Sequence, residues 1–233
     1  MATTNSFDLG VSEARRHERE AAVPVEFELL GRRWELLPEV FAPFHSRSTE
    51  TYSRWLPYPL DGSLLEMGCG AGVTAVFAAL SGCQHVTATD ISAAAVENVK
   101  LNAARHGMAS RVRALRGNMF DALAPDDRFD VIFWNSSAIE APADFVYGSD
   151  IEWSIFDRDY TSHRVYLRDG PKHLTERGRL FLGFNTNGNL ERLEHLAAEA
   201  GLRVDEVDSV TTTYNDHTTA KFMLLELVGV TLG

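Results

Sequence analysis

The stretch that decides the fold is LLEMGCGAGV, residues 64–73. An apolar run ends in Glu66, alternating glycines follow at Gly68, Gly70 and Gly72, and a helix-like segment comes next. Glycines lack Cβ atoms, so backbone N–H groups can approach a ligand at the helix N-terminus, where partial positive charge favours an anion. An ionised Glu66 has the opposite effect, because it repels negative charge and attracts a cation. The stretch therefore predicts a ligand-binding turn that also accommodates positive charge.

A second acid, Asp90, lies at a position suited to binding the ribose of a nucleoside. Asp90 closes the next apolar run, about 20 positions after Gly70, a spacing at which an acid accepts hydrogen bonds from ribose hydroxyls. The pattern Gly70-x-Gly72-x-x-Ala75 also fits dinucleotide-binding proteins, so a nicotinamide or flavin cofactor is an alternative. Glu66 would repel a pyrophosphate, whereas S-adenosylmethionine has no phosphate and carries a sulfonium and an ammonium group. The two acids and the glycines together favour S-adenosylmethionine.

This arrangement resembles the class I S-adenosylmethionine-dependent methyltransferases, whose first motif is an acid followed by x-G-x-G-x-G; residues 66–72 match it without a gap. The resemblance implies an α/β, Rossmann-like fold with a seven-stranded, mostly parallel sheet, a reversed last strand and helices on both faces. It also implies a set of cofactor-binding residues, which are Glu66, Gly68, Cys69, Gly70, Gly72, Asp90, Ile91, Asn118, Met119, Asn135 and Thr49.

Length and composition fit one globular unit. The chain has 233 residues, 45% of them hydrophobic, and a net charge of −11, which disfavours nonspecific attraction to nucleic acid or anionic lipid. No apolar run is long enough for a membrane span, and the first residues do not read as a signal peptide, so we expect a cytoplasmic protein. Cys69 and Cys83 form neither a disulfide framework nor a metal cluster, and no metal is predicted. The oligomeric state stays open.

The order of apolar and helical segments predicts βαβ units and a parallel sheet. Apolar runs at 63–67, 85–89, 112–116, 131–134 and 180–184 are separated by helical patterns at 73–80, 93–106 and 160–175. A helix at 190–200 and two strands at 202–210 and 220–228 follow; the short polar connection between the strands requires an antiparallel pair. Upstream, we expect a solvated helix or a loose arm, a hairpin around Gly31 and a helix from Ser48. We therefore predict an N-terminal arm and cap over 1–58 and a cofactor-binding domain over 59–233.

Residues that follow the strands are the site candidates, because ligands of open α/β sheets bind beyond the carboxyl ends of the strands. The resemblance assigns Asn118 to the adenine amino group, with Met119 or Phe120 against the ring. The stretch FDVIFWN, residues 129–135, resembles the subgroup that includes HemK-type glutamine methyltransferases and N6-adenine methyltransferases. In that subgroup Pro-Pro and an aromatic follow the asparagine and hold a planar nitrogen, whereas here Asn135 is followed by Ser-Ser-Ala. We interpret this change as a sign of a different acceptor.

The segment 136–160 is too long for an ordinary connection and carries several acids and aromatics. One interpretation is a substrate lid that favours an aromatic or cationic small molecule, and the other is an acidic solvated face with aromatics in the core. Methyl transfer mainly requires alignment, but a hydroxyl or a protonated amine needs a base. Asn135, His163 and Tyr166 are the catalytic candidates, with His45 and His217 as further possible bases.

Four functions are compatible with these observations. The leading hypothesis is S-adenosylmethionine-dependent O- or N-methyl transfer to a small-molecule substrate in specialised metabolism. The subgroup's usual acceptors, a protein glutamine or an RNA base, are the first alternative. A nicotinamide-dependent oxidoreductase and a non-catalytic relative that binds the cofactor are the other two.

Overall fold

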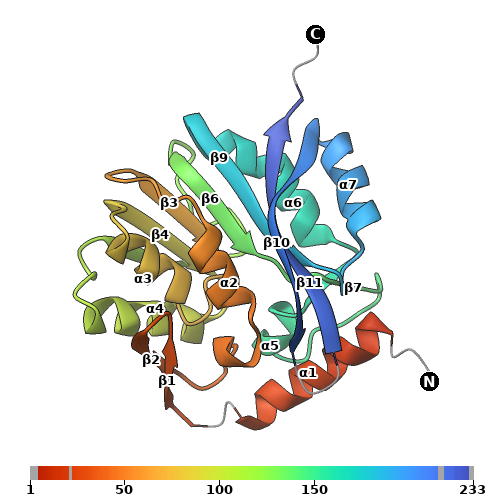
Figure 1. Cartoon of the computed structure of the whole chain (residues 1–233), viewed down its shortest axis with the longest axis horizontal. Coiled ribbons are helices and arrows are strands. Elements are labelled where there is room, and N and C mark those ends of the chain that lie inside the picture. The colour runs from red at the N-terminus through yellow and green to blue at the C-terminus, as the bar shows by residue number, and fades with distance from the viewer. Residues whose placement is uncertain (1–4, 21–22, 215–217, 231–233) are drawn as a thin grey trace.

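The computed structural model describes residues 5–20, 23–214 and 218–230. At its centre is a seven-stranded sheet with the strand order β10-β11-β9-β6-β3-β4-β5 (Figure 1). The strands are β3 (Ser63–Met67), β4 (His85–Asp90), β5 (Val112–Arg116), β6 (Phe129–Asn135), β9 (Leu174–Asn185), β10 (Leu202–Tyr214) and β11 (Thr218–Gly229). Neighbouring strands from β9 to β5 pair in parallel, whereas β11 is antiparallel to both β9 and β10. The predicted sheet, including its reversed last strand, is confirmed.

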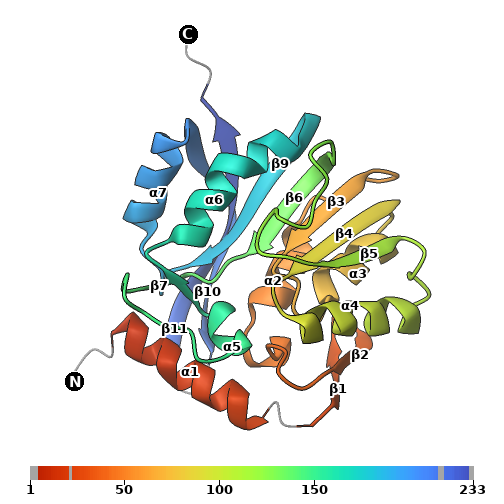
Figure 2. The same ribbon diagram turned by 180° about the vertical axis from the view of Figure 1, so that it is seen from behind.

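Helices cover both faces of the sheet, as predicted (Figures 1 and 2). One face carries α2 (Ser48–Trp55), α3 (Val73–Leu80) and α4 (Ala93–Arg105), and the other carries α6 (Thr161–Asp169) and α7 (Leu190–Glu199). The helix expected over 160–175 is shorter, because Pro171 lacks an N–H and a 3-10 turn, Gly170–His173, leads into β9. Across the described parts of the chain, no helix combines the length and apolar composition needed to cross a membrane.

Two hydrophobic clusters, one on each face, hold the sheet between its helices. In β6, Ile132 belongs to the cluster on the α6 and α7 side, and Phe133 belongs to the cluster with Tyr52 of α2. Ile132 and Phe133 are both fully buried, because side chains alternate between the faces and helices cover each face. This explains why β6 reads as an unbroken apolar run.

The predicted hairpin around Gly31 is confirmed and packs against α4. Strands β1 (Val25–Leu29) and β2 (Arg32–Leu36) join through Leu30 and Gly31, whose φ values of 53° and 69° suit a tight hairpin turn. Asn98 of α4 accepts from the N–H of Leu37 and donates to the Glu35 carbonyl. The hairpin is therefore held by side-chain amides rather than by the main sheet.

Of the two alternatives for the N-terminal arm, a solvated helix or a loose arm, the structure has a helix, α1 (Ser6–Glu20), but one side of it is buried. Ala14 and His17 are 3% and 1% exposed, and the His17 ring stacks on Phe41 with centroids 4.1 Å apart. The helix also packs on β7 (Ile139–Ala141) and α5 (Asp150–Trp153). Strand β7 pairs in parallel with β8 (Phe156–Arg158), so the segment 136–160 contains regular structure of its own.

Candidate functional site

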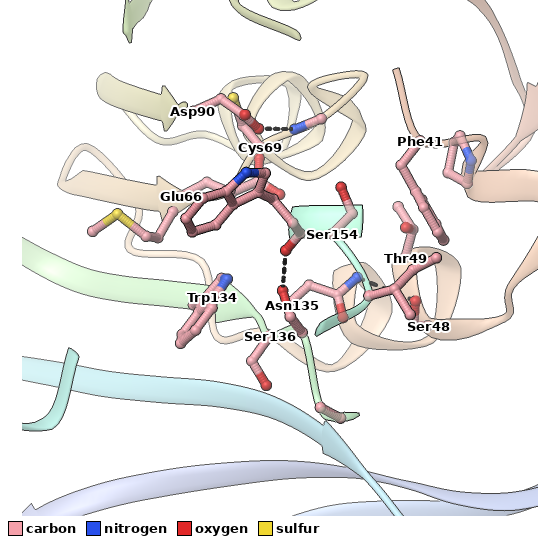
Figure 3. A pocket seen from close by; sticks show the side chains of 18 of the residues that line it. Phe41, Ser48, Thr49, Glu66, Cys69, Asp90, Trp134, Asn135, Ser136 and Ser154 are labelled. Atoms are coloured by element: carbon pink, nitrogen blue, oxygen red, sulfur yellow. Dashed lines mark hydrogen bonds between the residues drawn. The ribbon is translucent and has the colours of Figure 1, made fainter. Parts of the chain in front are cut away.

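A pocket opens beyond the carboxyl ends of β3, β4 and β6, where the topology places ligands of such sheets. Figure 3 shows Glu66 and Asp90 on one side of it and Ser48 and Thr49 on the other, with Asn135 between them. Its wall comes from the turn after β3, the residues that follow β4, β5 and β6, the segment 41–49, and the helices α1 and α5. Within the described residues this wall contains no Lys or Arg, but it contains four acidic residues, which are Glu13, Glu66, Asp90 and Asp150.

The turn after β3 requires glycine because of its backbone conformation. Gly68, Gly70 and Gly72 have φ values of 59°, 50° and 76°, in the left-handed region that side chains with a Cβ avoid. Gly72 also closely approaches α4, since a Cβ there would meet Val99 Cγ2 at 2.8 Å and Val99 Cα at 2.9 Å. The last glycine is thus needed for packing as well as for the turn.

Glu66 lies beneath the turn and joins it to α3. Its side chain is 4% exposed and accepts a hydrogen bond from the N–H of Ala75 at 2.7 Å. Burial raises the pKa of Glu66 to about 8, so in the protein alone this carboxyl is largely protonated at neutral pH. The sequence argument assumed an ionised Glu66; the burial makes that state depend on a nearby cation.

Asp90 connects the turn to the end of β4. One carboxylate oxygen accepts from the N–H of Gly70 at 2.9 Å, and the other accepts from the N–H of Ser92 at 2.9 Å. Burial raises the pKa of Asp90, and the two backbone hydrogen bonds act against that rise. Asp90 therefore shapes the turn and also presents its carboxyl to the pocket.

The structure brings together the residues that the sequence analysis proposed for cofactor binding. Those in the pocket wall are Glu66, Gly68, Cys69, Gly70, Asp90, Ile91, Asn118, Met119, Asn135 and Thr49. Gly72 is the exception, because it caps α3 and packs on α4 behind the wall. Asn135 is oriented by a hydrogen bond of 3.1 Å from its Nδ2 to Ser48 Oγ, which links β6 to α2.

Two catalytic candidates, His163 and Tyr166, are not brought to the pocket wall. His163 is 0% exposed, and its Nδ1 lies 2.7 Å from a carboxylate oxygen of Asp157, which also accepts from the His163 N–H. Tyr166 is equally buried and donates its hydroxyl to the Phe181 carbonyl at 2.6 Å. Both side chains belong to the core under α6. His217 lies outside the described residues.

Several wall residues were not assigned a role individually by the sequence analysis. Glu13 comes from α1, Phe41 precedes the 3-10 turn Pro43–His45, and Asp150 and Trp153 come from α5. The acids and aromatics of 136–160 were noticed as a group, but nothing local showed which of them would line a pocket. Glu13 carried no signal beyond its place in a charged helix.

Comparisons with known proteins agree with this geometry. The family model described as a methyltransferase domain matches residues 64–146. A release factor glutamine methyltransferase of Bordetella pertussis is 40% identical over 112 residues, which cover 46% of this chain and 40% of that protein. One of Neisseria gonorrhoeae is 30% identical over 163 residues, covering 66% of this chain and 59% of that protein. This chain thus spans about half the length of these relatives.

A solved structure shares the fold at low sequence identity. The ribosomal protein L11 methylase of Lactobacillus delbrueckii subsp. bulgaricus superposes with a TM-score of 0.58 and 17% identity, and the match covers 84% of each chain.

These relatives correct one expectation from the sequence. We expected a small-molecule substrate and disfavoured macromolecular ones, but the relatives are named for the methylation of glutamine in a protein, release factor. The acceptor expectation was wrong because it took Ser136 and Ser137 as a change of substrate class, although much of the surrounding sequence matches proteins of the glutamine-modifying type. The glycine turn, its two acids and the sheet topology agree with the matched methyltransferase domain, and in sequence and fold the chain is similar to the class I S-adenosylmethionine-dependent methyltransferases.

Proposed function

We propose that this protein transfers a methyl group from S-adenosylmethionine to a side-chain nitrogen of a protein substrate, and that the nitrogen is a glutamine amide. The observation that carries the proposal is Asn135, which lies at the end of β6 in the wall of the pocket that also holds Glu66 and Asp90. The names of the two relatives described above support the choice of glutamine.

The residues of the wall fit the cofactor. Glu66 and Asp90 offer carboxyl groups to a cationic ligand that carries a ribose, and the left-handed glycines leave backbone exposed beside them. The sulfonium of S-adenosylmethionine supplies an activated methyl group when it is bound. The approach of this cation favours the ionised form of Glu66, so binding is coupled to release of the Glu66 proton.

The chain's contribution to the chemistry is alignment. Ser48 engages Asn135 Nδ2, so the carboxamide is fixed and its Oδ1 is the group that we assign to an N–H of the acceptor amide. When the cofactor is bound, the acceptor nitrogen would form the new N–C bond as the C–S bond breaks, and the electron pair of the C–S bond would stay on the sulfur. The nitrogen would then lose one proton to water. The hydrogen bond that this nitrogen donates through its N–H to Asn135 Oδ1 orients the nitrogen toward the methyl group, and no buried base is required.

A protein acceptor is favoured over RNA by charge. The pocket wall holds four carboxyl groups and no Lys or Arg within the described residues, and the whole chain carries a net charge of −11. Phosphates of an RNA would meet like charge at the entrance, and protein–RNA affinity depends strongly on Lys and Arg.

The test uses cofactor labelled on its methyl group and three acceptor pools. These are a peptide library with central glutamine, a matched library with asparagine in its place, and total tRNA. We expect label in the glutamine pool, and we expect Asn135→Ala to reduce the rate by roughly tenfold or more if an oriented hydrogen bond is lost. The affinity for S-adenosylhomocysteine should change far less. Label in the asparagine pool or in tRNA alone, with cofactor binding intact, would overturn the glutamine assignment.

A further inference from the structure

The loop that follows Asn135 carries no aromatic ring, and its serines are engaged with backbone. Ser136 donates both its N–H and its hydroxyl to the Gly183 carbonyl of β9, at 3.0 and 2.9 Å. Ser137 donates its hydroxyl to the Trp153 carbonyl at the end of α5. The first serine therefore fixes the loop to the sheet, and the second ties α5 to the loop.

Trp153 is held in a defined orientation at this point. Its ring stacks on Tyr147, with centroids 3.6 Å apart and planes 10° from parallel. The Tyr147 hydroxyl in turn accepts from the N–H of Arg158 at 3.0 Å and donates to the Phe156 carbonyl at 3.3 Å. Tyr147 thus covers one face of the indole, and Trp153 is among the residues that line the pocket.

Helix α5 extends from the cofactor residues to the acceptor residues. Its first residue, Asp150, is close enough to Asp90 for its charge to contribute to the raised pKa of Asp90. Its last residue, Trp153, is bound through its carbonyl to Ser137, two positions after Asn135. Trp153 thus lies at the end of α5 nearest to the proposed acceptor group.

We infer that Trp153 forms the flat wall against which the acceptor amide packs, and that Ser137 is the residue that positions it. This inference rests on the proposed function and adds a specificity residue to it. A planar amide gains contact area and a favourable electrostatic interaction on an aromatic face. Because α5 supplies this aromatic ring, the loop after Asn135 does not need an aromatic residue of its own.

The test is a kinetic comparison of Trp153→Ala, Ser137→Ala and the double variant, with Trp55→Ala as a matched control. Trp55 lies on α2 and is not in the pocket wall. The acceptor is the peptide pool that the wild-type protein labels, so failure of the glutamine assignment is seen before any variant is measured. We expect Trp153→Ala to raise KM for the acceptor about tenfold, while kcat and the affinity for S-adenosylhomocysteine stay within about twofold.

The double variant separates positioning from a direct contact. If Ser137 acts through Trp153, Ser137→Ala raises KM severalfold in the wild-type background and has no further effect in the Trp153→Ala background. Equal effects in both backgrounds would overturn the role of Ser137. A weakened affinity for S-adenosylhomocysteine in Trp153→Ala, with acceptor KM unchanged, would assign the ring to the cofactor and overturn the inference.

A spectroscopic measurement provides a check that does not depend on turnover. Protein saturated with S-adenosylhomocysteine is titrated with a glutamine peptide while indole fluorescence is followed. We expect a change in emission in the wild-type protein and in Trp55→Phe, and its loss in Trp153→Phe. Trp134 also lines the pocket, so the titration is repeated in a Trp134→Phe background, in which Trp153 is the remaining indole of the wall. In that background, a change that persists after Trp153→Phe, or no change while Trp153 is present, would show that the acceptor does not pack on this ring.

Discussion

Replacing Gly72 by alanine is expected to destabilise the protein for two reasons that can be separated. The residue has a φ of 76°, and an L side chain in this left-handed conformation costs about 1–2 kcal/mol. The new Cβ would also lie 2.8 Å from Val99 Cγ2 and 2.9 Å from Val99 Cα. A rotation of the Val99 side chain about χ1 would relieve the first contact, but the second is to the backbone of α4, so the helix itself must shift. Overpacking of this kind costs about 1–3 kcal/mol, which gives a total of about 2–5 kcal/mol.

Two other glycines provide matched controls. Gly70 and Gly107 have φ values of 50° and 70°, and a Cβ at either position would meet no heavy atom within 4 Å. Their alanine variants should therefore lose only the conformational part, about 1–2 kcal/mol. The smaller entropy of the unfolded chain that accompanies any Gly→Ala change is common to all three variants and cancels in the comparison.

The assay is urea unfolding of the protein alone, followed by far-ultraviolet circular dichroism, with thermal melts as a second measurement. We expect Gly72→Ala to have the lowest midpoint, with an unchanged slope, and each kcal/mol lost should lower Tm by roughly 2–4 °C in a chain of this size. If the free energies of unfolding of Gly72→Ala and Gly70→Ala lie within about 0.5 kcal/mol of each other, the contact with Val99 adds no measurable cost, and the reasoning is refuted.

Three further predictions concern the titratable groups of the site and of α1. Asp90→Ala should weaken S-adenosylhomocysteine binding by about 1–3 kcal/mol in calorimetry, because a partly buried hydrogen-bonding carboxylate is lost. Burial lowers the pKa of His17 to about 3. Between about pH 3 and 6.5 the unfolded chain therefore binds a proton at His17 that the folded chain does not bind. The free energy of unfolding should rise with pH across this range by up to about 1.4 kcal/mol per pH unit. Burial raises the pKa of Glu66 to about 8, so its contribution to stability should fall as pH rises from about 4.5 to 8, and cofactor binding below pH 8 should release protons in buffers of different ionisation enthalpy.

Conservative variants check the last two predictions. His17→Asn keeps an acceptor for the Ala42 N–H, which His17 Nδ1 binds at 3.2 Å, and should remove the acid-side slope of stability against pH. Glu66→Gln should flatten the opposite slope and abolish proton release on binding. If the slope of stability against pH is unchanged in His17→Asn, the acid-side slope does not come from His17. If the slope is unchanged in Glu66→Gln, or if this variant still releases protons on binding, those effects do not come from Glu66. Asp90→Ala with unaltered affinity would show that the carboxyl shapes the turn without contacting the ligand.

The parts of the site that could be predicted are those in which local sequence fixes local geometry. Glu66 lies near the end of β3, directly before the glycine turn, and Asp90 ends the neighbouring strand, so their proximity depends only on the parallel pairing of β3 with β4. The same logic placed Asn135 at the end of β6. The alternation of apolar and helical segments was sufficient for the sheet, because each βαβ unit limits the arrangement of the next.

What escaped prediction depends on contacts between distant segments. The charged sequence of α1 hides a buried side made by Ala14 and His17, whose partners lie beyond residue 40 and in the segment 139–156. His163 follows the pocket segment in sequence, but its pairing with Asp157 turns it into the core. Trp153 reaches the pocket only because Ser137 and Tyr147 hold it there. The periodicity of apolar residues predicts which side of a helix or strand is buried, but it does not predict which distant segment packs against that side.

One of the side-chain amides of α4 that bind the hairpin also binds the glycine turn. Asn102 accepts from the N–H of Glu35 and donates to the carbonyls of Glu35 and Ala71, so one carboxamide spans the amino-terminal hairpin and the turn beside the cofactor residues. Any ligand that stiffens the turn therefore also restrains a β-ribbon that makes no contribution to the central sheet. Amide exchange in that ribbon would report occupancy of the pocket at a distance, and damage to the ribbon would loosen the turn without touching a single pocket residue.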